Sequence, residues 1–236
     1  MSRIKIGAAA IATAVSVAGQ SRADIVWEAS SGNLTAQSSF RIISTDLEVT
    51  LTNTSAADVQ QTSDVLTGVF FNLSGGSDLS PVSAIIAPGS TVLFGTTDPG
   101  GVVGGEWGYK NKAAPGFSSG ISTSHHNGFG PHTTFPGSNL VGSINTGGVE
   151  YGITSSGDNP ATGTSTVTGA DPLIRNSVVF RLGGLPSGFD LSQINAVQFQ
   201  FGTSSSTPSL NATGPIPAPS TLITFIAGAA LCRRRR

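Results

Sequence analysis

The chain has 236 residues, of which 38% are hydrophobic and 11% charged, and its formal net charge is −1. Of the 12 Lys and Arg, three lie in residues 1–23 and four are the last four residues of the chain. Residues 24–219 therefore contain five basic residues and all 13 Asp and Glu, which gives this region a net charge of −8. This acidic domain lacks the clustered bases that nucleic acid requires, which excludes a nucleic-acid partner. Cys232, the only cysteine, lies in the tail, so we expect no disulfide in the domain.

Residues 1–23 are typical of a secretory signal peptide. Arg3 and Lys5 supply positive charge, residues 6–18 are apolar, and Ser21-Arg22-Ala23 places small residues where a signal peptidase requires them. The apolar stretch is shorter than the ~20 residues of a spanning helix. We therefore expect signal peptidase to cut between Ala23 and Asp24; an uncleaved membrane anchor is the alternative.

Residues 24–210 have the periodicity of β-strands. Apolar and polar residues alternate, as in a strand with one buried face, at three places: Leu47, Val49 and Leu51; Val178, Phe180 and Leu182; and Val197, Phe199 and Phe201. Residues 65–73 and 83–94 are also rich in β-forming residues, and a turn at Pro88-Gly89 divides the second stretch. The pattern predicts an all-β domain, an antiparallel, jelly-roll-like β-sandwich.

Residues 95–163 hold 17 of the 31 glycines, and we interpret them as a long glycine-rich insertion between two strand-rich halves. Within it, Trp107 and Tyr109, beside Lys110 and Lys112, could form an exposed aromatic platform for a sugar or polymer. The interpretation that we favour is that both rings face the core from a strand, with Gly108 pointing away.

All three histidines, His125, His126 and His132, fall within eight residues of the same stretch. Imidazoles at close range bind zinc or copper. Their spacing matches no familiar metal motif, and adjacent side chains on an extended chain point in opposite directions. We therefore expect exposed loop histidines and no metal or other cofactor, with a histidine metal site as the alternative.

The run Gly116-Phe117-Ser118-Ser119-Gly120 fits the G-x-S-x-G form of a hydrolase nucleophile elbow. That elbow needs a strand before the serine, a helix after it, and an acid and a histidine later in the chain. No histidine follows residue 132, so we interpret the match as chance and expect no catalysis.

Two sequence patterns, a run of alternating threonines and a set of Asn-x-Ser/Thr triplets, have structural explanations. Thr162, Thr164, Thr166 and Thr168 alternate with other residues, which predicts a solvated edge strand with the hydroxyls on one face. Asn-x-Ser/Thr triplets begin at four positions and are interpreted as turn and strand-end residues: Asn33, Asn53, Asn72 and Asn211.

The tail combines three elements. Prolines at 215, 217 and 219 exclude a helix there. An apolar run of about a dozen residues follows, near 18 Å as a helix and short for a ~30 Å hydrocarbon layer. The chain closes on Arg233, Arg234, Arg235 and Arg236, and clustered basic charge holds that end on the cytoplasmic side.

This tail resembles that of the exosortase substrates, bacterial surface proteins with a PEP-CTERM sorting signal. Pro217, Ala218, Pro219 and Ser220 match a Pro-Ala-Pro-Ser variant of their motif, with Ala218 where Glu is usual, and residues 222–231 match their transmembrane stretch. The same tail is sometimes labelled an ice-binding protein C-terminal domain, which does not imply ice binding. The resemblance implies an exosortase-like sorting enzyme as a partner, transient attachment to the cytoplasmic membrane, and tail removal near Pro219.

We therefore expect a signal peptide in residues 1–23, a surface domain in 24–210 and a sorting tail in 211–236. The expected function is a non-catalytic structural or adhesive role at the cell surface or in the extracellular matrix. A carbohydrate-binding module that contacts extracellular polysaccharide through the glycine-rich loop is the alternative. A hydrolase or metal-binding protein is a further one.

Overall fold

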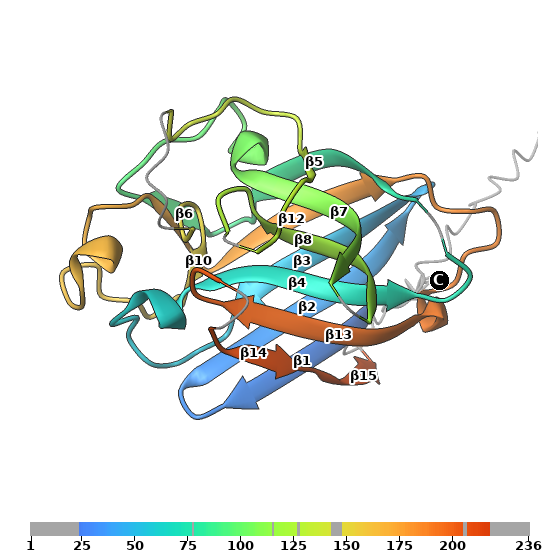
Figure 1. Ribbon diagram of the computed structural model, residues 1–236, viewed down its shortest axis with the longest axis horizontal. Coiled ribbons are helices and arrows are strands. Elements are labelled where there is room, and N and C mark those ends of the chain that lie inside the picture. Colours follow the sequence, from blue (N-terminus) through green and yellow to red (C-terminus); the bar gives the residue numbers. More distant parts are fainter. Residues whose placement is uncertain are drawn as a thin grey trace, which may run out of the picture.

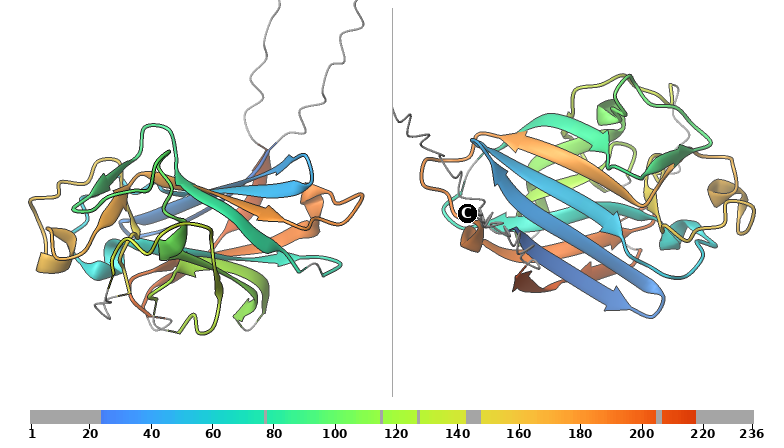
Figure 2. Two further views of the ribbon diagram at one scale, coloured as in Figure 1. Left: turned by 90° about the horizontal axis from the view of Figure 1, so that it is seen from above. Right: turned by 180° about the vertical axis from the view of Figure 1, so that it is seen from behind.

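The computed structural model describes residues 24–217, apart from residues 77, 115, 127, 143–147, 205 and 206. The described chain forms two β-sheets that pack face to face, as the edge-on view of Figure 2 shows. The expected all-β sandwich is therefore confirmed. Among the described residues, no helix is long and apolar enough to span a membrane.

The first sheet has six strands in the order β15-β1-β2-β3-β12-β5, and all its pairs are antiparallel. Its strands are β1 (Ile25–Ser31), β2 (Leu34–Ile43), β3 (Asp46–Asn53), β5 (Ser80–Ile86), β12 (Ser177–Gly183) and β15 (Thr213–Pro217). The alternations predicted around Val49 and Phe180 fall in β3 and β12, which are neighbours in this sheet.

The second sheet has nine strands, with the path β6-β11-β10-β4-β8-β7-β9 and a branch in which β13 pairs with both β4 and β14. Among the strand pairs of the described residues, only β10 and β11 are parallel. The strands are β4 (Leu66–Leu73), β6 (Thr91–Leu93), β7 (Trp107–Ala114), β8 (Phe117–Thr123), β9 (Thr133–Thr134), β10 (Ile153–Thr154), β11 (Leu173–Arg175), β13 (Ile194–Phe201) and β14 (Ser209–Asn211). Four short 3-10 helices connect strands: η1 (Thr62–Asp64), η2 (Gly104–Glu106), η3 (Ser165–Val167) and η4 (Leu191–Gln193).

Aromatic side chains join the two sheets across the core. Phe40 of β2 meets Phe71 of β4 edge-on with ring centroids 5.3 Å apart, and Trp107 of β7 meets Phe180 of β12 at 4.9 Å. All four rings are fully or almost fully buried. Such pairs add to the stabilisation that burial of their area supplies, so the sandwich is held by packing.

The glycine-rich stretch is part of the sandwich. It supplies β7 to β10, so the interpretation of residues 95–163 as an insertion needs correction for these strands. Gly108 and Gly120 lie on the face of the second sheet away from the core, where a Cβ on Gly108 would be 2.3 Å from Cδ2 of His132. Glycine is required at 108 because the segment after β8 folds back over it, and at 120 because the side chains of Ala113 and Phe70 lie over it.

The two ends of the domain lie side by side, since Ile25 of β1 pairs with Pro217 of β15 at the edge of the first sheet. β1 runs from this point toward the opposite end of the sandwich, where η1 and η3 lie (Figure 1). We call that opposite region, formed by residues 54–64 and 153–168, the loop end.

The predicted edge strand at Thr162 to Thr168 is wrong. Residues 165–167 form η3, and Thr168 donates its hydroxyl proton to the carbonyl of Thr164 at 3.0 Å. Thr162 likewise donates its hydroxyl to the carbonyl of Asn159 at 2.9 Å. Local hydroxyl bonds of this kind compete with a strand ladder, which explains the turn.

Candidate functional site

The sorting motif begins where the described domain ends. Pro217 is the last residue of β15, and Asp24 directly precedes β1. Ala23, Ala218, Pro219, Ser220 and Arg233 to Arg236 lie outside the described residues, so the expected cleavage site and sorting signal stay predictions. What the structure adds is the position from which each end of the chain leaves the domain.

Trp107 and Tyr109 do not form an exposed platform, which corrects their assignment as possible ligand-binding residues. Trp107 is 0% exposed and Tyr109 is 2% exposed. Tyr109 donates its hydroxyl proton to Oδ1 of Asn111 at 2.7 Å, and burial raises its pKa to about 12. The favoured interpretation is confirmed: both rings point inward from β7, while Gly108 points away.

A polar hollow of about 370 Å³ borders the same strand and is lined in part by Lys110, Asn111 and His132. Lys110 donates from Nζ to the carbonyl of Phe129 at 2.9 Å. His132 lies with Nδ1 2.8 Å from the carbonyl of Gly130, and its ring packs against Phe129 at 5.3 Å. These groups hold the folded-back segment to β7, so their first role is structural.

The histidines do not converge on a metal site. Among the described residues there is no group of three or more His, Cys, Asp or Glu side chains that could hold an ion. His126 is 5% exposed, which corrects the expectation of exposed histidines, while His125 and His132 are half-buried. Burial lowers the pKa of His126 to about 4, and neither ring nitrogen has a hydrogen-bond partner within the described chain.

The G-x-S-x-G run spans Gly116 and the first four residues of β8, and it does not make an elbow. Ser118 accepts a hydrogen bond from the amide of Leu73 at 2.9 Å, and its own amide donates to Oδ1 of Asn72 at 2.7 Å. The strand continues to Thr123 without the strand-to-helix turn that a nucleophile elbow requires. Ser118 therefore ties β8 to β4.

A constellation that the sequence did not indicate lies at the loop end, where Asp58 and Asp158 each accept a backbone amide from the other's segment. The amide of Asn159 donates to Oδ1 of Asp58 at 2.8 Å, and the amide of Val59 donates to Oδ1 of Asp158 at 3.2 Å. Each carboxylate thus binds the residue that follows the other aspartate. We call this arrangement of Asp58 and Asp158 the aspartate clasp.

The two carboxyl groups of the clasp differ in their proton affinity. Hydrogen bonds from Thr162 and from the amide of Asn159 lower the pKa of Asp58. Burial raises the pKa of Asp158, which is 6% exposed, and the neighbouring Asp58 carboxylate raises it further. A neighbouring like charge favours the neutral form of a carboxyl group, so Asp158 holds its proton more readily than Asp58 does.

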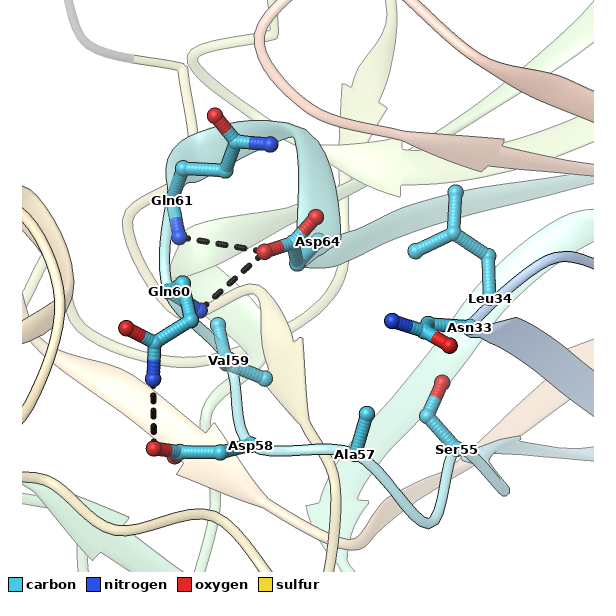
Figure 3. A pocket seen from close by; sticks show the side chains of 9 residues that line it. All are labelled: Asn33, Leu34, Ser55, Ala57, Asp58, Val59, Gln60, Gln61 and Asp64. Atoms are coloured by element: carbon cyan, nitrogen blue, oxygen red, sulfur yellow. Dashed lines mark hydrogen bonds between the residues drawn. The ribbon is translucent and has the colours of Figure 1, made fainter.

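A pocket of about 230 Å³ opens beside the clasp (Figure 3), between the β1-β2 turn and η1. Its two acidic residues are already engaged. Asp64 accepts the amides of Gln60 and Gln61, each at 3.1 Å, and the Asp58 side chain is bonded to Gln60. Figure 3 shows both carboxylates turned toward these donors, which makes the pocket a polar hollow with its charges satisfied by the protein.

The outer face of the first sheet carries a groove of about 620 Å³ along β5 and β12. Ile85 and Val179 contribute apolar surface, and Arg181 lies at the groove and donates to Oδ2 of Asp46 at 2.7 Å. Val82, nearby on β5, is 41% exposed. This face offers a contact surface for another macromolecule, although its charged groups are paired within the sheet.

Comparison with known proteins found no matching family model, curated protein or solved structure.

Proposed function

We propose that the chain is an exported bacterial surface protein whose C-terminal tail is processed by an exosortase-like enzyme, and that its domain has a structural or adhesive role outside the cell. The observation that carries the proposal is the order of a Pro-x-Pro motif, an apolar run and four arginines at the C-terminus. The basic, apolar leader supports the same route, because it has the features of a secretory signal.

The geometry of the domain is compatible with attachment by its tail. Because β15 is an edge strand that ends at Pro217, the predicted sorting motif begins at the last paired residue of the domain. The loop end lies at the far end of β1 (Figure 1). A domain held at Pro217 would therefore present the loop end away from its attachment point.

A non-catalytic role is supported by the residues that were candidates for chemistry. Ser118 bonds to β4 inside a strand, the Trp107 and Tyr109 rings are buried, and His126 is enclosed. The exposed sheet face with the Ile85 and Val179 groove is the kind of surface that a matrix protein can use for contacts.

Intact mass spectrometry of the protein from the cell surface and the medium tests the proposal. We expect a species that begins at Asp24 and ends near Pro219. A variant lacking residues 217–236 should be exported but lose its surface location. A mature mass that retains Arg233 to Arg236 would contradict the processing step, and an unchanged location of the truncated chain would contradict sorting.

A further inference from the structure

The polar hollow beside Lys110 lies where the edges of the two sheets meet. β5 ends the first sheet, β9 ends the main path of the second, and the hollow of about 370 Å³ is lined by residues from the start of β5, from β7 and from the segment that leads into β9. Its volume falls within the range of ligand pockets, about 300–1,000 Å³. We call it the edge hollow.

The edge hollow carries positive charge in an acidic domain. No acidic side chain lines it in the described part of the chain, and Asp78, just before the lining begins at Leu79, is exposed. The three arginines of the domain contact acidic residues: Arg41 pairs with Glu48, Arg181 with Asp46, and Arg175 with the main chain of Asp158. Lys110 forms no ion pair with any described residue, so its charge is available to an anion.

The ammonium group of Lys110 is held in place and has donors to spare. Nζ donates to the carbonyl of Phe129 at 2.9 Å, which uses one of its three N–H groups. A Cβ on Gly130 would be 3.4 Å from Nζ, so the folded-back segment lies close against the ammonium group. A lysine that the protein has already ordered loses less side-chain entropy when an anion binds.

His132, which also lines the hollow, is fixed as firmly. Its Nδ1 lies 2.8 Å from the carbonyl of Gly130, and its ring packs against Phe129. Because a carbonyl only accepts, Nδ1 carries the proton, and Nε2 is an acceptor in the neutral ring. The ring occupies the space that a side chain at Gly108 would need. The protein therefore places a cationic donor and an acceptor at one hollow before any ligand arrives.

We propose that the edge hollow binds a uronate, a sugar that carries a carboxylate, within an acidic polysaccharide. Lys110 receives the carboxylate through a charge-assisted hydrogen bond. His132 and the exposed hydroxyls of Ser80 and Thr133, which also line the hollow, bond to the sugar hydroxyls. The inference names a ligand class for the adhesive role proposed above and rests on that role.

An acidic peptide fits the same place less well. A peptide that binds at a sheet edge adds a strand, and its main chain needs free backbone partners there. Pro81 has no N–H, and farther along β5 the amide of Ile86 donates to Gly101 while the carbonyl of Ala84 accepts from Val103. A sugar needs no strand register and uses the separate donors and acceptors that line the hollow.

Calorimetric titration of the purified full-length chain, in mild detergent at pH 7.5 and about 20 mM sodium chloride, tests the site. The probes are tetragalacturonate, tetramannuronate, the neutral sugar maltotetraose and a capped tetraglutamate peptide. We expect saturable binding of at least one uronate probe, and binding at least about tenfold weaker for maltotetraose and tetraglutamate. If neither uronate binds, or if maltotetraose or tetraglutamate binds as tightly, the proposal is overturned.

A matched pair of variants gives the binding its location. Lys110→Gln should raise the dissociation constant of the bound uronate probe about tenfold, because the charge-assisted bond is lost. Lys112→Gln removes the same charge from an exposed residue of β7 that does not line the hollow, and it should change the constant by less than about twofold. Equal losses in the two variants would assign the effect to net charge and refute the site.

A further variant covers the case in which Lys110→Gln does not fold. Ser80 is exposed at the rim of the hollow, so Ser80→Trp fills the space without entering the core and should abolish uronate binding. Binding that survives in Ser80→Trp would refute the site. Because the titration uses purified chain, its failure leaves tail processing standing, and a mature mass that retains the four C-terminal arginines leaves the titration standing.

Discussion

Replacing Asn53 by Ala tests whether a buried amide holds the end of β3 at the loop end. Asn53 is 1% exposed, and its Nδ2 donates to the carbonyl of Ile153 at 3.0 Å. Its Oδ1 accepts the amide of Ser55 at 3.1 Å. Both bonds are buried, so one side chain ties β3 to β10 and to the chain that leads into the clasp.

The magnitude follows from the partners that the substitution leaves behind. The carbonyl of Ile153 and the amide of Ser55 would each lose a buried hydrogen bond, at a cost of about 1–3 kcal/mol apiece. We expect Asn53→Ala to lower the free energy of unfolding by about 3 kcal/mol. For a domain of this size that corresponds to a Tm about 6–12 °C lower.

Urea unfolding followed by tryptophan fluorescence measures the difference, with Asn33→Ala as the control. Asn33 begins the same kind of Asn-x-Ser/Thr triplet, but it lies exposed in the β1-β2 turn, so its replacement should change stability by less than about 0.5 kcal/mol. If Asn53→Ala costs no more than Asn33→Ala, the amide does not hold the strand end, and the reasoning fails.

Three further predictions concern buried groups. Burial lowers the folded pKa of His126 from 6.5 to about 4, so its contribution to stability is present above pH 6.5 and is lost as the pH falls toward 4. This pH-dependent part of the unfolding free energy amounts to about 3 kcal/mol. Urea unfolding of His126→Gln, measured across this pH range, should lack it. Gly104→Ala would put a Cβ 1.9 Å from the carbonyl oxygen of Pro136, so we expect a loss of about 3 kcal/mol in unfolding free energy. Tyr109 should ionise near its raised pKa of about 12 in the folded protein and near 10 once unfolded, measured by the ultraviolet absorbance of tyrosinate.

Each of these has a result that would count against it. A stability curve of His126→Gln parallel to that of the wild type between pH 4 and 6.5 would mean that the ring is not enclosed. Gly157→Ala is the control for Gly104, because its Cβ would be 3.8 Å from the nearest atom, the carbonyl oxygen of Ala56. Equal effects of the two glycine changes would contradict the close approach at Gly104. Ionisation of Tyr109 near pH 10 in the folded state would contradict its burial.

The strands with strict alternation could be predicted from the sequence, because the alternation of apolar and polar residues marks a segment as a strand and also shows which of its faces is buried. Leu47, Val49 and Leu51 are fully buried on β3, as their spacing predicted. The turn at Pro88-Gly89 was also expected. Its consequence was not, since it transfers the chain from β5 in one sheet to β6 in the other, and which sheet a strand joins depends on distant partners.

The glycine-rich strands and the clasp could not be predicted for a different reason. Gly108 and Gly120 depress the strand signal of β7 and β8, yet they are needed because side chains from residues 129–132 and from the neighbouring strand lie over them. The pattern Trp107-Gly108-Tyr109 favoured a buried pair but did not exclude an exposed one. Asp58 and Asp158 meet only after the chain between them has folded, and neither has a neighbouring motif.

The pairing of β15 with β1 has a mechanical consequence. The registered pairs run from Ile25 with Pro217 to Glu28 with Thr213, and the ladder bonds of an antiparallel pair lie perpendicular to the strands. When force is applied to Pro217 along the strand and the domain is held at the loop end, the force loads all these hydrogen bonds together in shear. When the domain is held at Ile25, the same force breaks the bonds one after another, starting from the pair of Ile25 with Pro217. The domain should therefore withstand tension far better when its grip is at the loop end than when it is at its own N-terminus.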